Sequence, residues 1–494
     1  MMGKTKQREA KLFYTSFSLE ERIGRDNRYR RINEVLDFSF IRPMVVKHYG
    51  QRGHTSEDPI VIMKLMLILF LENIPSEREL MRRLGERLDW LWFCEFDLDD
   101  IIPHHSILSK ARRRWGLEVF EEFFQVVLTQ CMQAGLVDGT IVHLDSSLIQ
   151  GDVSVNSLEP AFAVLAREKF KQLEDSCYQS DKTSESSDSD SQSGPPIPSA
   201  PMNGKTKLSK TDPQARCRRK GKQEVIGYQE HRIVDDAYGI ITASETTDAS
   251  VGEGKTLSTM IEQHQKNAGS KVVHAVADKA YGSAANYEYL QKENILPCIP
   301  HKKHTAVNTQ AYPSSKFTYI PEEDHCICPA GAILKRQSKH PNVRGQVIYR
   351  VKASICHSCE QCEECFGGQI GKQGKSICRN LGQEYLAWAD ECIPKSKRIH
   401  LLNRRKTLIE GSFGDAATHH GFKRSRWRSW QRMKIQNRLI ATLQNLRKLV
   451  KYGHQKRSAP EEAALNSFFA AFLAVQQAMR MFLSSYSTKI CLVT

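Results

Sequence analysis

Two aspartates each follow a short apolar run in the sequence. Asp145 ends the run Val-His-Leu-Asp, and Asp278 ends the run Val-His-Ala-Val-Ala-Asp. Ligands collect at the carboxyl ends of strands in open α/β sheets, and a buried carboxylate needs a cation or hydrogen-bond donors because an unpaired buried charge is costly. Either residue alone could be an exposed strand end or a helix cap. As a pair they favour a metal site.

Glu410 is a third acid that fits the same site. It is followed by Gly-Ser-Phe-Gly-Asp, and Ile409 and Phe413 would anchor its helix to the sheet. Between residues 403 and 457 the acids are Glu410 and Asp415, against fifteen Lys and Arg. A single glutamate among cations is often only a salt-bridge partner, so its local sequence alone leaves the role of Glu410 open.

Six cysteines gather between residues 326 and 365, out of 14 in the chain. No apolar leader follows the basic N-terminus, which indicates a cytosolic protein whose cysteines are thiols or metal ligands rather than disulfides. Structural Zn²⁺ takes four tetrahedral thiolate or imidazole ligands and is the metal that we expect. An iron–sulfur cluster and unligated thiols are the alternatives, although the long final gap and Cys-Pro of the ferredoxin pattern are missing. The clustered residues are Cys326, Cys328, Cys356, Cys359, Cys362 and Cys365.

A positive charge excess indicates a polyanionic partner. The chain carries 71 Lys and Arg against 56 Asp and Glu, a net charge of +15. The segment 421–434 interleaves cations with two tryptophans, a pattern that suits phosphates and unpaired bases. The alternative is a solvated basic face with both tryptophans in the core. A second basic run at 205–222 fits a flexible DNA-contacting loop. We expect DNA contacts from Arg404, Arg405, Lys423, Arg424, Arg426, Trp427, Arg428 and Trp430.

The surrounding pattern predicts an α+β multidomain protein. A hydrophobic fraction of 40% and a mean hydropathy of −0.48 fit a soluble globular chain. Helical periodicity dominates at the start, where Ser76 and Glu79 form a capping box. After Gly139, strands alternate with helices, as in an α/β sheet. The apolar stretch 463–483 contains polar interruptions and is interpreted as an amphipathic or buried helix rather than a membrane span.

These patterns divide the chain into five predicted parts. They are a helical domain at 1–135, the first part of an α/β domain at 136–325 with a disordered loop at about 176–222, a cysteine-rich insertion at 326–395, a basic helical region with Glu410 at 396–457, and a C-terminal helix at 458–494. The family resemblance given next implies that the first of these is a DNA-binding domain and the second is part of a catalytic domain.

The chain resembles the DDE transposases of bacterial insertion sequences, in the groups related to the IS-five and IS-eleven-eighty-two elements. The resemblance covers about 55–452 and rests on segments in a specific order. These are GLVDGTIVHLDSSLIQGDVS, KTDPQARCRRKGK, GYQEHRIVDDAYGIITA, VVHAVADKAYGS, CPAG with the cysteines after it, RRKTLIEGSFGDAATHHGFKRSRWRSW and LQNLRKLVK. It implies an RNase H-like catalytic domain with a zinc-ribbon-like insertion.

The resemblance also assigns the site. It places the catalytic acids on Asp145, Asp278 and Glu410, which would hold two Mg²⁺ or Mn²⁺ ions for phosphoryl transfer, with Asp145 bridging both. The zinc ligands would be Cys328, Cys356, Cys359 and Cys365, leaving Cys326 and Cys362 as spare ligands. The family usually has a lysine seven positions after the glutamate, where this chain has Ala417.

The function implied is cleavage and strand transfer at the inverted ends of a mobile element. The partner is double-stranded DNA, a homodimer would hold both ends together, and the setting is the bacterial cytoplasm at the nucleoid, away from membranes. Ala417 leaves open a decayed or repurposed copy that only binds DNA. A nuclease on the same fold that does not transfer strands is the third reading.

Overall fold

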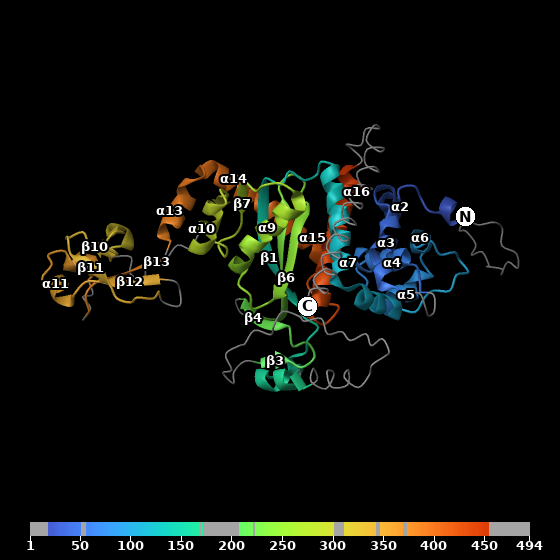
Figure 1. Ribbon diagram of the computed structural model, residues 1–494, viewed down its shortest axis with the longest axis horizontal. Helices are drawn as coiled ribbons and strands as arrows, with labels where there is room; N and C mark the ends of the chain where they lie inside the picture. Colours follow the sequence, from blue (N-terminus) through green and yellow to red (C-terminus); the bar gives the residue numbers. More distant parts are fainter. Residues whose placement is uncertain are drawn as a thin grey trace, which may run out of the picture.

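The computed structural model describes residues 18–50, 56–167, 169–170, 207–220, 223–300, 311–341, 346–368, 373–380 and 382–453. It is a mixed α+β multidomain protein, as the sequence predicts. Helices at one end, a central sheet and a smaller sheet at the other end follow one another along the long axis (Figure 1). The predicted C-terminal helix at 458–494, with the apolar stretch 463–483, and most of the predicted disordered loop lie outside the described residues.

The N-terminal part is a cluster of helices around one buried helix. Its helices are α1 (Leu19–Arg22), α2 (Arg28–Val35), α3 (Ile41–Val45), α4 (Pro59–Leu71), α5 (Glu77–Leu84), α6 (Leu88–Phe93) and α7 (Ser106–Gln133), with short 3₁₀ turns at Phe38–Phe40 and Val46–His48.

Local sequence explains how these helices begin. Helix α4 begins behind Asp58, whose side chain accepts a hydrogen bond from the Ile60 N–H, and Pro59 occupies its first turn. The remaining residues of α4 are buried all round, so this helix forms the centre of the domain. Ser76 caps α5 by accepting from the Glu79 N–H, which is one half of the predicted capping box, while the Glu79 carboxylate accepts from Arg82 and Arg83. Gly116, at φ 65°, interrupts α7.

The central sheet has the order β4-β5-β1-β7-β8, and β6 pairs with β5. Strands β7 and β8 run parallel to β1, whereas β5 runs antiparallel to β1, and β4 and β6 run antiparallel to β5. The pairing register sets Asp145 opposite Arg232. The strands are β1 (Ile141–Gln150), β4 (Arg216–Lys220), β5 (Gln223–Asp235), β6 (Ile241–Asp248), β7 (His274–Val276) and β8 (Leu296–Cys298).

Helices cover both faces of this sheet. One face packs Val142 and Leu144 against helix α9 (Leu257–Ala268), near α10 (Ala284–Lys292) and α13 (Gln383–Glu391). The other face lies against α16 (Trp430–Tyr452), which runs beside α7 and joins the sheet to the N-terminal helices in one continuous core (Figure 1). Helix α14 (Lys395–Arg405), a π-helical turn (Lys406–Glu410) and α15 (Gly411–His420) follow in sequence and lead to α16.

A separate five-stranded antiparallel sheet carries the clustered cysteines. Its order is β13-β12-β11-β10-β9, and it lies at the far end of the molecule from the N-terminal helices (Figure 1). It begins before residue 326, the predicted start of the insertion. Its elements are β9 (Thr318–Ile320), β10 (His325–Ile327), β11 (Ile333–Arg336), β12 (Gln346–Arg350), α11 (Ala353–His357), α12 (Cys362–Phe366) and β13 (Ser376–Asn380).

The predicted disordered loop at about 176–222 extends too far. Its last part folds as β3 (Lys207–Ser209), which pairs with β2 (Leu158–Pro160), and as β4, which forms an edge of the central sheet. The basic composition of this stretch hid the strands, because their stability comes from pairing with distant residues. None of the helices in the described part of the chain is both long and apolar enough to cross a membrane.

Candidate active site

Asp145 lies inside β1, five residues before the last residue of the strand at Gln150. The sequence predicted it at the strand end, so this detail was wrong. The parallel pairing with β7 nevertheless ends at His143, which leaves Asp145 just beyond the point where β7 stops. Its Oδ1 accepts from the Ser146 N–H at 2.8 Å. Burial is the main cause that raises the pKa of the Asp145 carboxyl, and nearby Asp278 raises it further.

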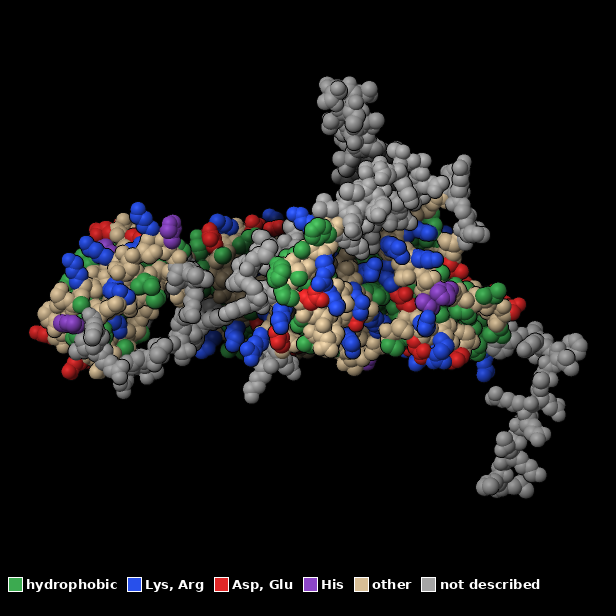
Figure 2. Space-filling view, turned by 90° about the horizontal axis from the view of Figure 1, so that it is seen from below, with side chains coloured by type: hydrophobic (Ala, Val, Ile, Leu, Met, Phe, Trp, Pro, Cys, Tyr) green, Lys and Arg blue, Asp and Glu red, His purple; other side chains and the backbone are tan. Residues whose placement is uncertain are grey.

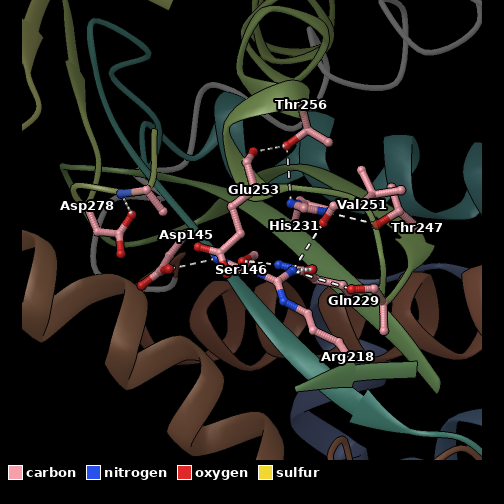
Figure 3. A network of polar contacts seen from close by, with 12 residues as sticks. Asp145, Ser146, Arg218, Gln229, His231, Thr247, Val251, Glu253, Thr256 and Asp278 are labelled. Atoms are coloured by element: carbon pink, nitrogen blue, oxygen red, sulfur yellow. Dashed lines mark hydrogen bonds and ion pairs between the residues drawn. The ribbon is translucent and has the colours of Figure 1, made fainter. Parts of the chain in front are cut away.

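Asp278 follows β7 by two residues, as the sequence predicted for a strand end. Its Oδ1 accepts from the Ala280 N–H at 2.8 Å, which fixes the turn after the strand. Figure 3 shows Asp145 on β1 and, near it, Asp278 in the turn that follows the neighbouring strand β7. The two aspartates therefore meet although 132 residues separate them in the chain.

Glu410 is the last residue of the π-helical turn between α14 and α15. Ile409 is fully buried and Phe413 is 7% exposed, so both anchor this turn as predicted. The Glu410 side chain is 57% exposed, and its Oε1 lies 3.8 Å from Nη2 of Arg405. A π-helical turn in the middle of a helix frequently marks a functional site.

Arg405 connects the acids. Its Nη1 donates to Asp145 Oδ2 at 2.8 Å while its Nη2 faces Glu410, and only 10% of its side chain is exposed. The sequence predicted that Arg405 contacts DNA, whereas here it is the positive charge between two proposed metal ligands. Across the described ranges, no three His, Cys, Asp or Glu side chains lie close enough together to hold a metal ion as they stand. The donor set itself fits, because carboxylate oxygens are the ligands that Mg²⁺ prefers.

A polar network beside Asp145 was missed by the sequence reasoning. Gln229 donates to Ser146 Oγ at 2.6 Å and accepts from Arg218, whose other amino group donates to Glu253 at 3.0 Å (Figure 3). Buried Tyr281 hydrogen-bonds to Ser146 and faces Asp145, Glu253 and Asp278; burial and these acids raise its pKa. These residues hold the strand around Asp145. No motif marks them, because only the strand register brings them together.

Arg232 was also missed, and it fastens the helix that follows Glu410. Its guanidinium is fully buried and lies 4.7 Å from the ring centroids of both Phe413 and Phe422. It donates to Ser412 Oγ at 3.2 Å and to Gln444 Oε1 at 2.9 Å. Arg232 thereby ties α15 and α16 to the strand opposite Asp145.

Several predicted DNA-contacting side chains have partners within the chain. Arg404 pairs with Asp236 at 2.5 Å, and Lys423 donates to Ser147 Oγ at 2.5 Å. Trp430 donates to the Thr246 carbonyl at 2.7 Å. The segment around Arg424 extends the sheet, since the Gln150 N–H donates to the Lys423 carbonyl and the Gln150 carbonyl accepts from the Ser425 N–H. The Arg424 side chain itself is exposed.

Arg426 and Trp427 lie against the N-terminal helices, and Arg428 lies beside the loop that follows β1. Arg426 donates to the Leu69 carbonyl at 3.0 Å and to Asn73 Oδ1 at 2.9 Å. The guanidinium of Arg112 lies 3.8 Å from the ring centroid of Trp427. Arg428 pairs with Asp152 at 3.0 Å. The structure thus gives this part of the basic segment a role in joining two domains, beside any contact with DNA.

The cysteine-rich part contains a cavity of about 390 Å³. The Cys328 sulfur accepts from the Ala332 N–H at 3.2 Å, and the Cys356 sulfur accepts from the Lys375 N–H at 3.4 Å. Cys326 points elsewhere, into the core of the small sheet, where it is 1% exposed. The cysteines that line the cavity are Cys328, Cys356, Cys359, Cys362 and Cys365.

Two family models match the chain. Residues 17–114 match the family described as "Transposase domain (DUF772)", and residues 130–446 match "Transposase DDE domain". Both describe transposases, so the chain is an enzyme of this class, which cleaves DNA and transfers strands with divalent metal ions. Since the second match spans more than half of the 494 residues, the chain belongs to the Transposase DDE domain family.

Other comparisons add little detail. The chain is similar to a solved structure titled "Cryo-EM structure of piggyBac transposase synaptic complex with hairpin DNA", with 10% identity and a TM-score of 0.35 over 86% of this chain and 74% of that one. No curated protein matches.

Proposed function

We propose that this transposase cuts and joins DNA through Asp145, Asp278 and Glu410. The observation that carries the proposal is the meeting of the two aspartates beside the end of β7, with Glu410 connected to Asp145 through Arg405. Bound divalent ions would activate the attacking oxygen and stabilise the leaving oxygen. Asp145 holds the central position between the other two acids, and the Ser146 and Ala280 N–H groups orient the two aspartates.

We assign an RNase H-like architecture to the catalytic domain. Strand order supports this: three antiparallel strands, β6, β5 and β1, continue into the parallel strands β7 and β8. Mg²⁺ or Mn²⁺ is the proposed metal, because the ligands are carboxylates. The cysteine-rich part is then a zinc-ribbon-like insertion between β8 and α13.

For the insertion, the proposed Zn²⁺ ligands are Cys328, Cys356, Cys359 and Cys365. All four line one cavity, and two of their sulfurs accept backbone N–H groups, the outer contacts that orient metal-bound thiolates. Cys362 lines the same cavity and is the alternative ligand, whereas Cys326 belongs to the core of the small sheet.

The proposed substrate is double-stranded DNA at the inverted ends of the element and at the target, in the bacterial cytoplasm at the nucleoid. Both ends must be held together during joining, which supports a homodimer. Among the predicted cationic DNA contacts, Arg424 has an exposed side chain that shows no intramolecular hydrogen bond or ion pair in the described structure, whereas its backbone is hydrogen-bonded.

The test is incubation with Mg²⁺ and a duplex taken from the DNA that flanks the gene. The native chain is expected to give cleaved and joined products, and Asp278→Asn is expected to give neither. Cleaved product without joined product would instead support a nuclease. Duplex binding with no product from either protein would support a decayed copy, for which the change to Ala417 is the motivating observation. Equal products from both proteins would refute the role of the acids.

A further inference from the structure

A cavity of about 560 Å³ lies where the N-terminal helices meet the segment after α15. Its walls carry more positive than negative charge, since six arginines face only Glu77 and Asp152 among the acidic lining residues. Lys and Arg side chains also dot the surface over both domains (Figure 2). The arginines are Arg78, Arg112, Arg113, Arg426, Arg428 and Arg432.

The acids of the cavity neutralise only part of this charge. Arg112 pairs with Glu77 at 2.5 Å, and Arg428 pairs with Asp152 at 3.0 Å. The hydrogen bonds described for the Arg426 guanidinium go to neutral oxygens, and burial lowers its pKa to about 10. An anion in the cavity would reduce this imbalance.

Arg112 adds an independent sign of a ligand. It is 6% exposed, yet its Nε and Nη1 are buried without a hydrogen-bond partner in the described structure. Buried polar groups are nearly always hydrogen-bonded, and an orphaned donor calls for a specific explanation. Because Nη2 pairs with Glu77, these two N–H groups lie on different edges of the guanidinium, and each can donate one charge-assisted hydrogen bond to an anionic oxygen.

We propose that this cavity binds a backbone phosphate of the DNA on which the transposase acts. The inference rests on the proposed function only in taking DNA as the substrate. The cavity reaches Asp152, two residues beyond the end of β1, the strand that carries Asp145.

Two neighbouring arginines of α7 offer a matched test. Arg113 and Arg114 are both exposed, but Arg113 lines the cavity, whereas the Arg114 guanidinium lies over the ring of Tyr49 at 4.7 Å. Arg113→Gln and Arg114→Gln therefore remove the same charge from adjacent positions. Arg78→Gln, on α5, repeats the test from a second wall of the cavity.

The measurement is the affinity for a fluorescein-labelled flanking duplex between about 50 and 200 mM salt. Loss of one phosphate contact is expected to weaken binding about tenfold at the lowest salt concentration. It should also reduce the slope of log affinity against log salt concentration by about 0.9. Arg113→Gln and Arg78→Gln should show both effects, and Arg114→Gln neither. Equal binding by Arg113→Gln and Arg114→Gln would overturn the proposal.

Thermal unfolding with inorganic phosphate separates the free anion from DNA. If phosphate stabilises the native chain more than Arg113→Gln, while duplex binding is the same for both, the cavity holds a free anion and the assignment to DNA is wrong. The Asp278→Asn cleavage assay is independent of these results. Cleaved and joined products from Asp278→Asn would refute the proposed role of the three acids and leave the proposed phosphate site untouched. Native-like duplex binding by Arg113→Gln would refute only the phosphate site.

Discussion

Arg232 is a buried guanidinium beneath the helix that follows Glu410. It pairs with Glu230 at 3.6 Å, and both side chains are fully buried. Replacing it in Arg232→Met keeps much of the side-chain length but removes the charge and the hydrogen bonds to Ser412 and Gln444. The variant therefore leaves the Glu230 carboxyl buried without its cation.

The expected cost follows from this burial. Breaking a buried ion pair by removing one partner costs about 3 to 5 kcal/mol. We expect the lower end, about 3 kcal/mol, because Glu230 still accepts hydrogen bonds from Ser244, Thr246 and Asn437. Burial already raises the pKa of Glu230, so the carboxyl can also take up a proton, which limits the loss.

Urea unfolding at neutral pH measures this change, with Glu230→Gln and the double variant completing a cycle. If the pair is coupled, the double variant loses at least about 1 kcal/mol less than the sum of the single variants. If the losses of the two single variants simply add in the double variant, Arg232 and Glu230 do not stabilise each other. Because Ser412 and Phe413 lie two and three residues after Glu410, cleavage by Arg232→Met should also fall under conditions in which the variant is folded.

Three further changes test other parts of the structure. Gly227→Ala should lower the free energy of unfolding by about 3 kcal/mol or more, because its Cβ would overlap the backbone of the neighbouring β1. An unchanged Tm in thermal unfolding would contradict this close contact between the strands. Burial lowers the pKa of His231 to about 3, below its unfolded value of about 6.5, so its contribution to stability is present above pH 6.5 and is lost as the pH falls, at about 1.4 kcal/mol per unit. Urea unfolding at several pH values should show that His231→Gln loses less stability on acidification than the native chain. An identical pH profile would show that His231 does not cause the loss. Arg405→Gln removes the cation between Asp145 and Glu410, so Mn²⁺ binding measured by electron paramagnetic resonance should tighten about tenfold; weaker binding would show that the arginine supports the site instead.

Local signals in the sequence predicted much of the fold. The Ser76 cap and the anchoring pair Ile409 and Phe413 depend on neighbours within a few residues, and both are in place. The turn after β7 at Asp278 could also be predicted from the sequence, because a short apolar run ends there.

Features that depend on partners distant in the chain could not be predicted from the sequence. Asp145 appeared to end a strand because the apolar run stops there, whereas β1 continues since its pairing with β5 supports polar residues. Arg405 looked like a DNA contact because the residue that neutralises it lies 260 positions away. Strand β4 was assigned to a disordered loop because its basic residues have no apolar pattern, although Arg218 is held by Gln229 and Glu253. In each case a contact from another element decided the outcome.

The most direct test of the central claim is the single-turnover cleavage rate of pre-bound flanking DNA in Mg²⁺. Asp145→Asn, Asp278→Asn and Glu410→Gln should each bind the duplex and cleave about a hundredfold to a thousandfold more slowly, as expected when charge stabilisation of the transition state is lost. Asp415→Asn is the matched control, because it removes the other acid of the basic region; it loses the pair with Arg447 and a charged acceptor for Gln444, so it is compared under conditions in which it is folded and should then cleave at close to the native rate. A native cleavage rate in any of the three acid variants would contradict the catalytic role proposed for that acid.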